Sequence, residues 1–196
     1  MKCSYSNLGT TNLVNLVFLL GTVLSAFFAL PATAQKSSQP PARFTERVQK
    51  EVIHKILMLP NYDAFDSISF RVEGYNVVLL GYVTQPYLKS DAERAVKKIE
   101  GVEKVENRIE VLPLSPNDDR LRAQLFRAIY GYGPLQRYAL PPIKPIRIVV
   151  DRGHVILEGV VDSAMDKNLA NIRANGVPGV FSVTNNLAVP PKKSKK

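Results

Sequence analysis

A long internal repeat constrains the fold of this chain more than any other feature of its sequence. Residues 72–111 recur as residues 150–189 at a constant offset of 78 positions (159 − 81, the spacing between Gly81 and Gly159), and the alignment needs no gap. The positions identical in both copies are Val72, Val77, Leu79, Gly81, Val83, Lys89, Ala92, Gly101, Val102, Val105, Asn107 and Val111. A register kept over such a length indicates a tandem duplication, so we expect two similar domains rather than one large one.

The N-terminal segment has the pattern of a secretory signal peptide. Lys2 precedes an apolar run at residues 13–30, and Ala32 and Ala34 are the small residues that a signal peptidase accepts. We therefore predict a cleaved signal peptide at residues 1–34 and a periplasmic protein. The alternative is an uncleaved anchor, because a run of this length nearly spans a bilayer.

Cysteine usage narrows the chemistry of the mature chain. The one cysteine, Cys3, precedes the apolar run, so signal-peptide cleavage would leave none. This excludes disulfides, thiol nucleophiles and thiolate metal sites from the mature protein. A polar, proline-rich segment at residues 35–42 then predicts a flexible linker.

The formal net charge of +9 is largely a property of the C-terminus. Residues 190–196 form a basic tail that contains Lys192, Lys193, Lys195 and Lys196. Each lysine near an anionic membrane surface contributes about 1 kcal/mol of attraction. The alternative is a plain solvated end.

Hydrophobic periodicity predicts the first half of each repeat. Apolar residues recur at every fourth position from Phe44 to Ile56, which indicates a helix. Alternating runs at residues 68–72 and 77–83 flank a Gly/Asn turn and predict a β-hairpin. The second copy shows the same pattern, with a helical stripe at 121–129 and strands at 146–150 and 155–161.

The second half of each repeat predicts a helix and a third strand. Thr84 can cap a helix with Pro86 in its first turn, and Ser163 with Asp166 resembles a capping box at the equivalent place. Apolar stripes at residues 92–99 and 170–177 follow, and then alternating strands at 105–111 and 183–189. The predicted fold is α+β, with two αββαβ repeats at residues 43–113 and 117–189, each a three-stranded sheet covered by two helices. Domains of this size have small cores, so we expect the repeats to pack on one another.

Two pairs of repeated residues have predicted structural roles. Gly81 and Gly159 lie on the buried face of their strands, which indicates that another backbone, presumed to be that of a helix laid across the sheet, passes close by. Asn107 and Asn185 share the inner face of the last strand, where we expect their amides to bond to main chain rather than to a ligand.

The repeated motif resembles the BON domain, a bacterial module named for an osmotically induced periplasmic protein and nodulation proteins. Its residues here are the hairpin strand 77–83, the helix 89–99 and Gly101-Val102-x-x-Val105-x-Asn107, with Gly159 and Gly179-Val180-x-x-Val183-x-Asn185 in the second copy. The resemblance implies an αββαβ fold, export, and binding to phospholipid or envelope partners rather than catalysis. The second repeat departs from the pattern at residues 130–145, which are longer and richer in proline and tyrosine than usual.

No constellation of residues indicates an enzyme, a cofactor or a metal centre. The two histidines, His54 and His154, occupy different repeat positions, and no cluster of histidine and carboxylate residues has metal-ligand spacing. The sequence contains no glycine-rich phosphate loop and no nucleophile elbow. We therefore predict a non-catalytic protein.

The irregular segment at residues 130–145 is the predicted contact surface. Its candidate residues, together with the lysine tail, are Arg127, Tyr130, Tyr132, Arg137, Tyr138 and Lys144. Tyrosines beside cations suit a lipid headgroup layer. Nucleic-acid bases would use similar residues, but export argues against them. The alternative is that Tyr130 and Leu135 only cover the open end of the core.

Three functional hypotheses follow. The first is a peripheral module that binds anionic phospholipid and supports envelope integrity or osmotic stress tolerance. The second is a protein-interaction module that binds envelope proteins or another copy of itself. The third is a stress-protective protein with little specific binding.

Overall fold

A computed structural model describes residues 41–191. The predicted signal peptide, nearly all of the predicted linker and the four tail lysines lie outside the described residues. Repeat 1 consists of α1 (Ala42–Leu57), β1 (Ser67–Glu73), β2 (Asn76–Val83), α2 (Pro86–Lys97) and β3 (Lys104–Val111). Repeat 2 consists of α3 (Pro116–Tyr130), the 3-10 helix η1 (Gly133–Ala139), β4 (Ile146–Asp151), β5 (His154–Gly159), α4 (Ala164–Asn175) and β6 (Ser182–Asn185).

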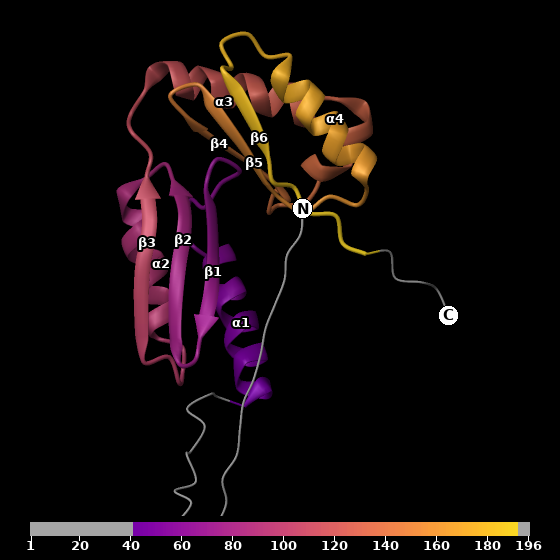
Figure 1. Ribbon diagram of the computed structural model, residues 1–196. Coiled ribbons are helices and arrows are strands. Elements are labelled where there is room, and N and C mark those ends of the chain that lie inside the picture. The colour runs from indigo at the N-terminus through magenta and orange to yellow at the C-terminus, as the bar shows by residue number, and fades with distance from the viewer. Residues whose placement is uncertain (1–40, 192–196) are drawn as a thin grey trace, which may run out of the picture. The chain divides into compact units, whose positions relative to one another are not determined.

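The α+β class and the αββαβ order are confirmed in both repeats. Each sheet has three strands, with the first antiparallel to the second and the third parallel to it. The parallel pairing requires a crossover, which α2 and α4 provide. Figure 1 shows the two helices of each repeat on one face of its sheet. None of the helices within residues 41–191 has the length and apolar content needed to cross a membrane.

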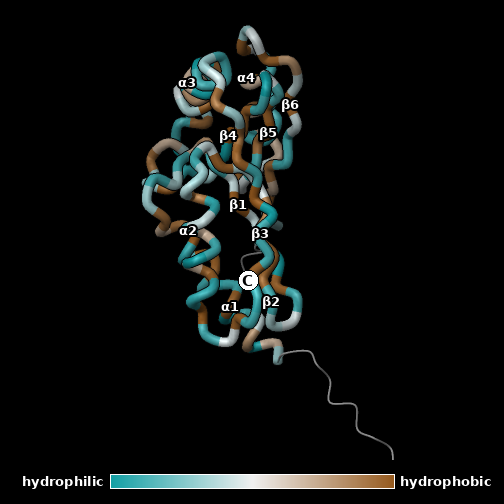
Figure 2. Tube along the Cα trace, turned by 90° about the vertical axis from the view of Figure 1, so that its left-hand side faces the viewer, coloured by the Kyte–Doolittle hydropathy of each residue, from teal (hydrophilic) through white to brown (hydrophobic). Residues whose placement is uncertain are grey.

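The core of each repeat lies between the sheet and its helices. The predicted stripes are buried, with Val48 and Val52 of α1 and Ala92 and Val96 of α2 fully inaccessible. Figure 2 shows hydrophobic and hydrophilic positions interleaved along the helices, as expected where one face of each helix is buried. Repeat 2 is built in the same way around Leu125.

The last strand of repeat 2 is shorter than predicted. Alternation predicts a strand over residues 183–189, but β6 ends at Asn185 and only an isolated bridge joins Val160 to Ala188. Backbone hydrogen bonds continue past Asn185, because the Ala188 amide donates to the Gly159 carbonyl at 2.9 Å. The irregularity begins where β5 ends, at Gly159.

Gly81 and Gly159 do admit a close backbone, but the predicted neighbour is wrong. A Cβ at Gly81 would lie 2.0 Å from the Ser67 carbonyl oxygen, and one at Gly159 would lie 1.9 Å from the Pro145 carbonyl oxygen. The neighbour is therefore the start of the adjacent strand and not a helix across the sheet. Both glycines have positive φ, 120° and 115°, a conformation that side-chain-bearing residues rarely adopt.

The two predicted helix starts have different outcomes. The Ser163 hydroxyl accepts from the Asp166 amide at 3.1 Å, so the second cap is confirmed. Thr84 is not a cap, because α2 begins after Gln85. The amide and hydroxyl of Thr84 instead donate to the buried Asp66 carboxylate at 2.7 and 2.9 Å.

The repeated asparagines bond to main chain, as predicted. The Asn107 side-chain amide donates to the Lys89 carbonyl at 2.8 Å, and Asn185 donates to the Lys167 carbonyl at the same distance. Each of these bonds ties a helix to the last strand of its sheet. Both side chains are only half-buried.

The segment between α1 and β1 contacts repeat 2. The Ala64 carbonyl accepts from the Ile148 amide at 2.8 Å, and the Asp63 carbonyl accepts from the Arg147 guanidinium at 2.6 Å. Phe65 packs against the core of repeat 2. The edge of β4 is therefore partly covered by repeat 1, which accepts one of its backbone hydrogen bonds.

Candidate binding surface

Tyr130 belongs to the core and not to the surface. Its side chain is 3% exposed, and its hydroxyl donates to the Ile146 carbonyl and accepts from the Ile146 amide at 3.2 Å. Burial raises the pKa of Tyr130 well above its ordinary value, so the phenol stays neutral. Leu135 is fully buried nearby. Tyr130 and Leu135 therefore cover the open end of the core, and Tyr130 ties the start of the irregular segment to its end.

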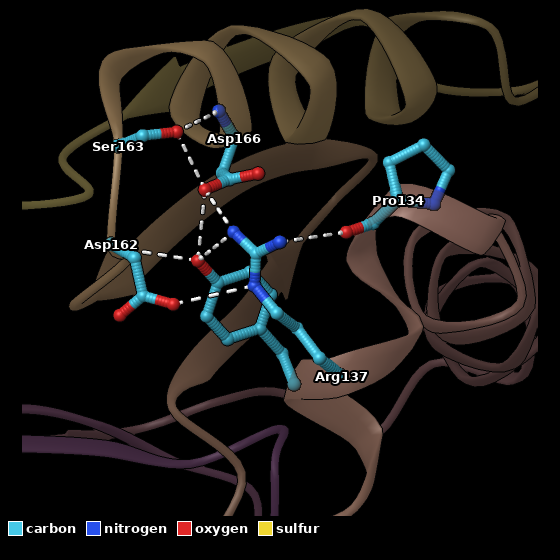
Figure 3. Close-up of polar contacts among 6 residues, drawn as sticks. Pro134, Arg137, Asp162, Ser163 and Asp166 are labelled. Carbon is cyan, nitrogen blue, oxygen red and sulfur yellow. Dashed lines mark hydrogen bonds and ion pairs between the residues drawn. The ribbon is translucent and has the colours of Figure 1, made fainter.

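Tyr138 is also buried, at the centre of a polar cluster. Its hydroxyl accepts from the Asp162 amide at 2.8 Å and donates to the Asp166 carboxylate at 3.0 Å. The Arg137 guanidinium donates to both the Tyr138 hydroxyl and the Asp166 carboxylate (Figure 3). The cluster fixes η1 to the start of α4.

Electrostatics within this cluster favour the charged forms of its ion pair. Burial opposes ionisation of Asp166, but hydrogen bonds from Ser163 and Tyr138 and the charge of Arg137 outweigh it, so the pKa of Asp166 is lowered. Burial raises the pKa of Tyr138, which keeps this phenol as a hydrogen-bond donor. Arg137 is half-exposed, but the charge that it presents is largely committed to Asp162 and Asp166.

Tyr132 is half-buried beneath a cation from α4. The Arg173 guanidinium lies 4.9 Å from the centroid of the Tyr132 ring and donates to the Ala128 carbonyl at 3.1 Å. The three predicted tyrosines therefore point mainly inward. The structure does not gather them into an exposed aromatic patch.

The exposed apolar residues of this region are instead at the tip of its proline-rich part. Leu140 is 81% exposed and Ile143 is 37% exposed, on either side of two prolines. The Lys144 ammonium donates to the carbonyls of Ala139 and Pro141 at 2.9 and 2.8 Å. Lys144 thus bonds back to the start of this segment, and it forms no ion pair with a carboxylate of the described residues. We call residues 140–144 the apolar tip.

Two adjoining hollows run beside the apolar tip along α3. They measure about 400 and 270 Å³ and share Phe126 and Arg127 in their walls. The rings of Phe65, Phe126 and Tyr130 form a row, with centroids 6.1 and 4.7 Å apart. Arg127 is exposed, and among the described residues its side chain bonds only to the Ala123 carbonyl of its own helix, at 3.2 Å. The one carboxylate in these walls is that of Asp63, which accepts from the Ala64 amide.

Only some of the predicted contact residues therefore lie on this surface. Arg127 and Lys144 remain beside exposed apolar groups, whereas Tyr130 and Tyr138 do not. Leu140, Ile143 and Phe126 were not predicted. The sequence signal for the first two was a pair of aliphatic residues in a proline-rich segment, where no regular element could bury them.

The described residues form no cluster that could act as a metal site. No group of three or more His, Cys, Asp or Glu residues among them could hold a metal ion. His154 bonds to the Ser182 hydroxyl at 2.7 Å, and His54 is exposed on α1. The lysine tail lies outside the described residues.

Two consecutive αββαβ units with shallow surface hollows define a tandem α+β binding module. The chain belongs to the BON domain family, whose model matches residues 46–113 and 117–191. Membership indicates a non-catalytic binding module associated with the bacterial cell envelope.

Similarity to other proteins is otherwise slight. No curated protein matches the chain in sequence. One solved structure, CdsD, a structural protein of the Type III secretion system of Chlamydia trachomatis, is 14% identical, with a TM-score of 0.28, over 75% of this chain and 94% of its own. The C-terminal domain of the same protein is 14% identical over 72% and 96%, with a TM-score of 0.27. Similarity at this level supports no inference about function.

Proposed function

We propose that this chain is an exported module that docks peripherally on anionic phospholipid and supports the integrity of the envelope under osmotic stress. The apolar tip enters the layer between headgroups and acyl chains, and Arg127 and Lys144 pair with phosphates beside it. The observation that carries the proposal is the exposure of Leu140 next to Lys144, which forms no ion pair within residues 41–191.

The magnitudes describe a reversible contact. Full burial of one aliphatic side chain contributes about 1.5–3 kcal/mol. Each cation near an anionic surface adds about 1 kcal/mol. The tip with its two cations is therefore a weak anchor, and the lysine tail strengthens it by about 1 kcal/mol for each lysine that reaches the surface.

Co-sedimentation with vesicles tests the proposal. The mature chain (residues 35–196) and the same chain without its tail (residues 35–191) are mixed with anionic or neutral vesicles at about 0.15 M salt, where the screening length is about 8 Å. We expect both proteins to pellet with anionic vesicles only, and the shorter protein to pellet less. If only the longer protein pellets, the tail is a simple electrostatic anchor and the folded repeats hold no lipid site.

A pair of matched variants separates the apolar tip from general surface hydrophobicity. Leu140→Ser with Ile143→Ser removes the apolar groups of the tip, and we expect it to abolish pelleting of the protein without its tail. Leu114→Ser is the control, since Leu114 is 92% exposed in the connection between the repeats and outside this surface. Equal losses for both variants would contradict the proposed contact.

A further inference from the structure

A further hollow of repeat 2, larger than the two beside α3, lies away from the apolar tip. The first turn of α3, the β4–β5 turn and the α4–β6 connection meet at one end of this repeat (Figure 1). They enclose an open hollow of about 540 Å³ whose walls include Leu121, Arg152, Gly153 and Phe181. None of these residues contributes to the proposed lipid contact.

The equivalent place in repeat 1 is filled by two aromatic rings. Phe44, at the start of α1, packs edge-to-face on Tyr75 with centroids 5.1 Å apart. The ring of Phe44 lies against Gly101, where a Cβ would be 2.4 Å from it. The Phe44 helical position corresponds to Leu121 and the Tyr75 position to Gly153, by the offsets of 77 and 78 residues.

Repeat 2 lacks both rings: Leu121 stands in place of Phe44, and the ring of Phe181 lies 2.5 Å from the position that a Cβ would take at Gly153, the counterpart of Tyr75. Leu121 packs over Gly179 as Phe44 does over Gly101, but its Cδ2 atom would lie 3.2 Å from a Cβ there. Tyr75 and Gly153 are equivalent in structure as well as in sequence. The Tyr75 carbonyl accepts from the Glu103 amide in repeat 1, and the Gly153 carbonyl accepts from the Phe181 amide in repeat 2, both at 2.9 Å. The hollow therefore lies where repeat 1 packs two aromatic rings, and Leu121 and Phe181 leave an open volume of about 540 Å³ there.

An exposed aromatic side chain borders the hollow. Phe181 is 78% exposed and lies over Gly153, whereas repeat 1 has the charged Glu103 at the same position. The ring of Phe181 and the side chain of Leu121 line the same hollow, and contiguous exposed apolar groups are typical of a surface that a partner covers. Pro178 adds a further apolar group to the wall.

The charges around the hollow favour an anion. Arg120 and Arg152 line it; Arg152 pairs with Asp151 at 3.1 Å, and Arg120 forms no ion pair with the described residues. The one acidic residue in the wall is Asp118, whose oxygens accept from the Arg152 and Gly153 amides at 3.0 and 2.9 Å. An incoming carboxylate would meet a guanidinium with free donors rather than a free acid.

We propose that this hollow binds a segment of a partner protein that presents an aromatic side chain next to a carboxylate. The ring takes the place that Phe44 fills in repeat 1 and packs against Phe181 and Leu121. The carboxylate pairs with Arg120, assisted by Arg152. This site is separate from the proposed lipid contact and does not depend on it.

Titration with N-acetyl-phenylalanine, which carries the ring and a free carboxylate, tests the proposal. We expect saturable amide shifts, in proton–nitrogen NMR spectra of residues 35–196, centred on Gly153, Gly179 and Phe181. N-acetyl-phenylalanine amide lacks the carboxylate, and we expect it to bind about two- to fivefold more weakly, as for the loss of an exposed charge pair. Shifts that do not saturate, that centre elsewhere, or that are equal for both probes would overturn the proposal.

Two variants locate the binding. Leu121→Phe restores the side chain of repeat 1, for which the absent Cβ of Gly179 leaves room, and we expect it to weaken binding at least about tenfold by filling the space. Arg120→Gln is an exposed change that preserves the fold, and we expect it to reproduce the affinity of the amide probe. Binding that neither variant affects would overturn the proposal.

Competing occupants have distinct outcomes. If residues 35–196 self-associate in sedimentation velocity and Leu121→Phe abolishes the association, the occupant is a second copy of this chain. If anionic vesicles displace the probe from wild-type protein, the occupant is a lipid. Either result would overturn the assignment to a partner protein.

Discussion

The hydroxyl of Tyr130 bonds to both the carbonyl and the amide of Ile146, and so closes the proline-rich segment at its base. Tyr130 ends α3 and Ile146 begins β4, so a single side chain joins the two elements between which this segment runs. One phenol group therefore links two residues that are sixteen positions apart in the sequence. The apolar tip is presented from a base that cannot spread apart without breaking these bonds.

Tyr130→Phe should lower the free energy of unfolding by about 1–2 kcal/mol, because two buried hydrogen bonds are lost while the ring still fills its place. Urea denaturation followed by tyrosine fluorescence measures the loss, since the chain has no tryptophan. Tyr87→Phe, at an exposed position on α2, is the control and should change stability little. Equal stability of the two variants would show that the Ile146 bonds contribute nothing.

Gly81→Ala and Gly159→Ala should each destabilise the protein by about 3 kcal/mol or more, because the new Cβ meets a carbonyl oxygen at about 2 Å and the residue must keep a positive φ. Gly133→Ala is the matched control, since no atom lies within 4 Å of the Cβ that it would add. Thermal unfolding of the three variants compares them. A small effect at Gly81 would mean that β1 and β2 separate there without loss.

Asp166 should make stability depend on pH at the acidic end. Its pKa is lower in the folded chain than the ordinary 3.8, so its contribution is complete above about pH 4 and is lost as the pH falls through the folded value. Asp166→Asn should therefore be less stable than wild type at neutral pH, and the difference should shrink below about pH 4.

Asp162→Asn is the control for this pH dependence. Asp162 pairs with the same arginine at 3.3 Å, but its side chain is 72% exposed. Exposed pairs contribute about 0–1 kcal/mol, so its removal should change stability little at any pH. Urea midpoints for both variants at neutral and acidic pH make the comparison. A difference for Asp166→Asn that is constant with pH would contradict the role given to its charge.

Arg147→Met should weaken the contact between the repeats by about 1.5–3 kcal/mol, the range for a hydrogen bond from a charged group. The guanidinium donates to the Asp63 carbonyl and lies 4.4 Å from the centroid of the Tyr62 ring. We expect the wild type to unfold in a single calorimetric transition and Arg147→Met to broaden or divide that transition. Arg108→Met removes an exposed arginine paired with Glu106 and should leave the transition sharp.

Much of the fold could be predicted from the sequence because it depends on local periodicity. The helices around Val52 and Ala92 and the hairpins follow from which positions are apolar. The neighbour of Gly81 could not be predicted, since its identity depends on how β1 begins against β2. Thr84 has the chemistry of a helix cap, but the buried carboxylate of Asp66, far away in sequence, binds it instead.

The candidate surface was less predictable, because exposure depends on what the rest of the chain covers. Tyr130 and Leu140 both stand in an irregular segment, and nothing local distinguishes the buried residue from the exposed one. The distinction comes from tertiary hydrogen bonds. The Tyr130 hydroxyl bonds to the Ile146 backbone in the core, whereas Leu140 lies in the exposed segment that Lys144 closes by donating to the Ala139 carbonyl. The hollow beside Phe181 could not be predicted, because it depends on how three segments that are distant in sequence pack at one end of repeat 2.

The position of Phe65 affects how the protein reaches its native state. This ring belongs to repeat 1 in sequence but packs against the core of repeat 2. A chain is synthesised from its N-terminus and its earlier domain generally folds first. When repeat 2 folds, the ring of Phe65 and the Ala64 carbonyl of repeat 1 are therefore already in place to contact it. The duplicated halves are alike in architecture, but they are not interchangeable in the order of assembly.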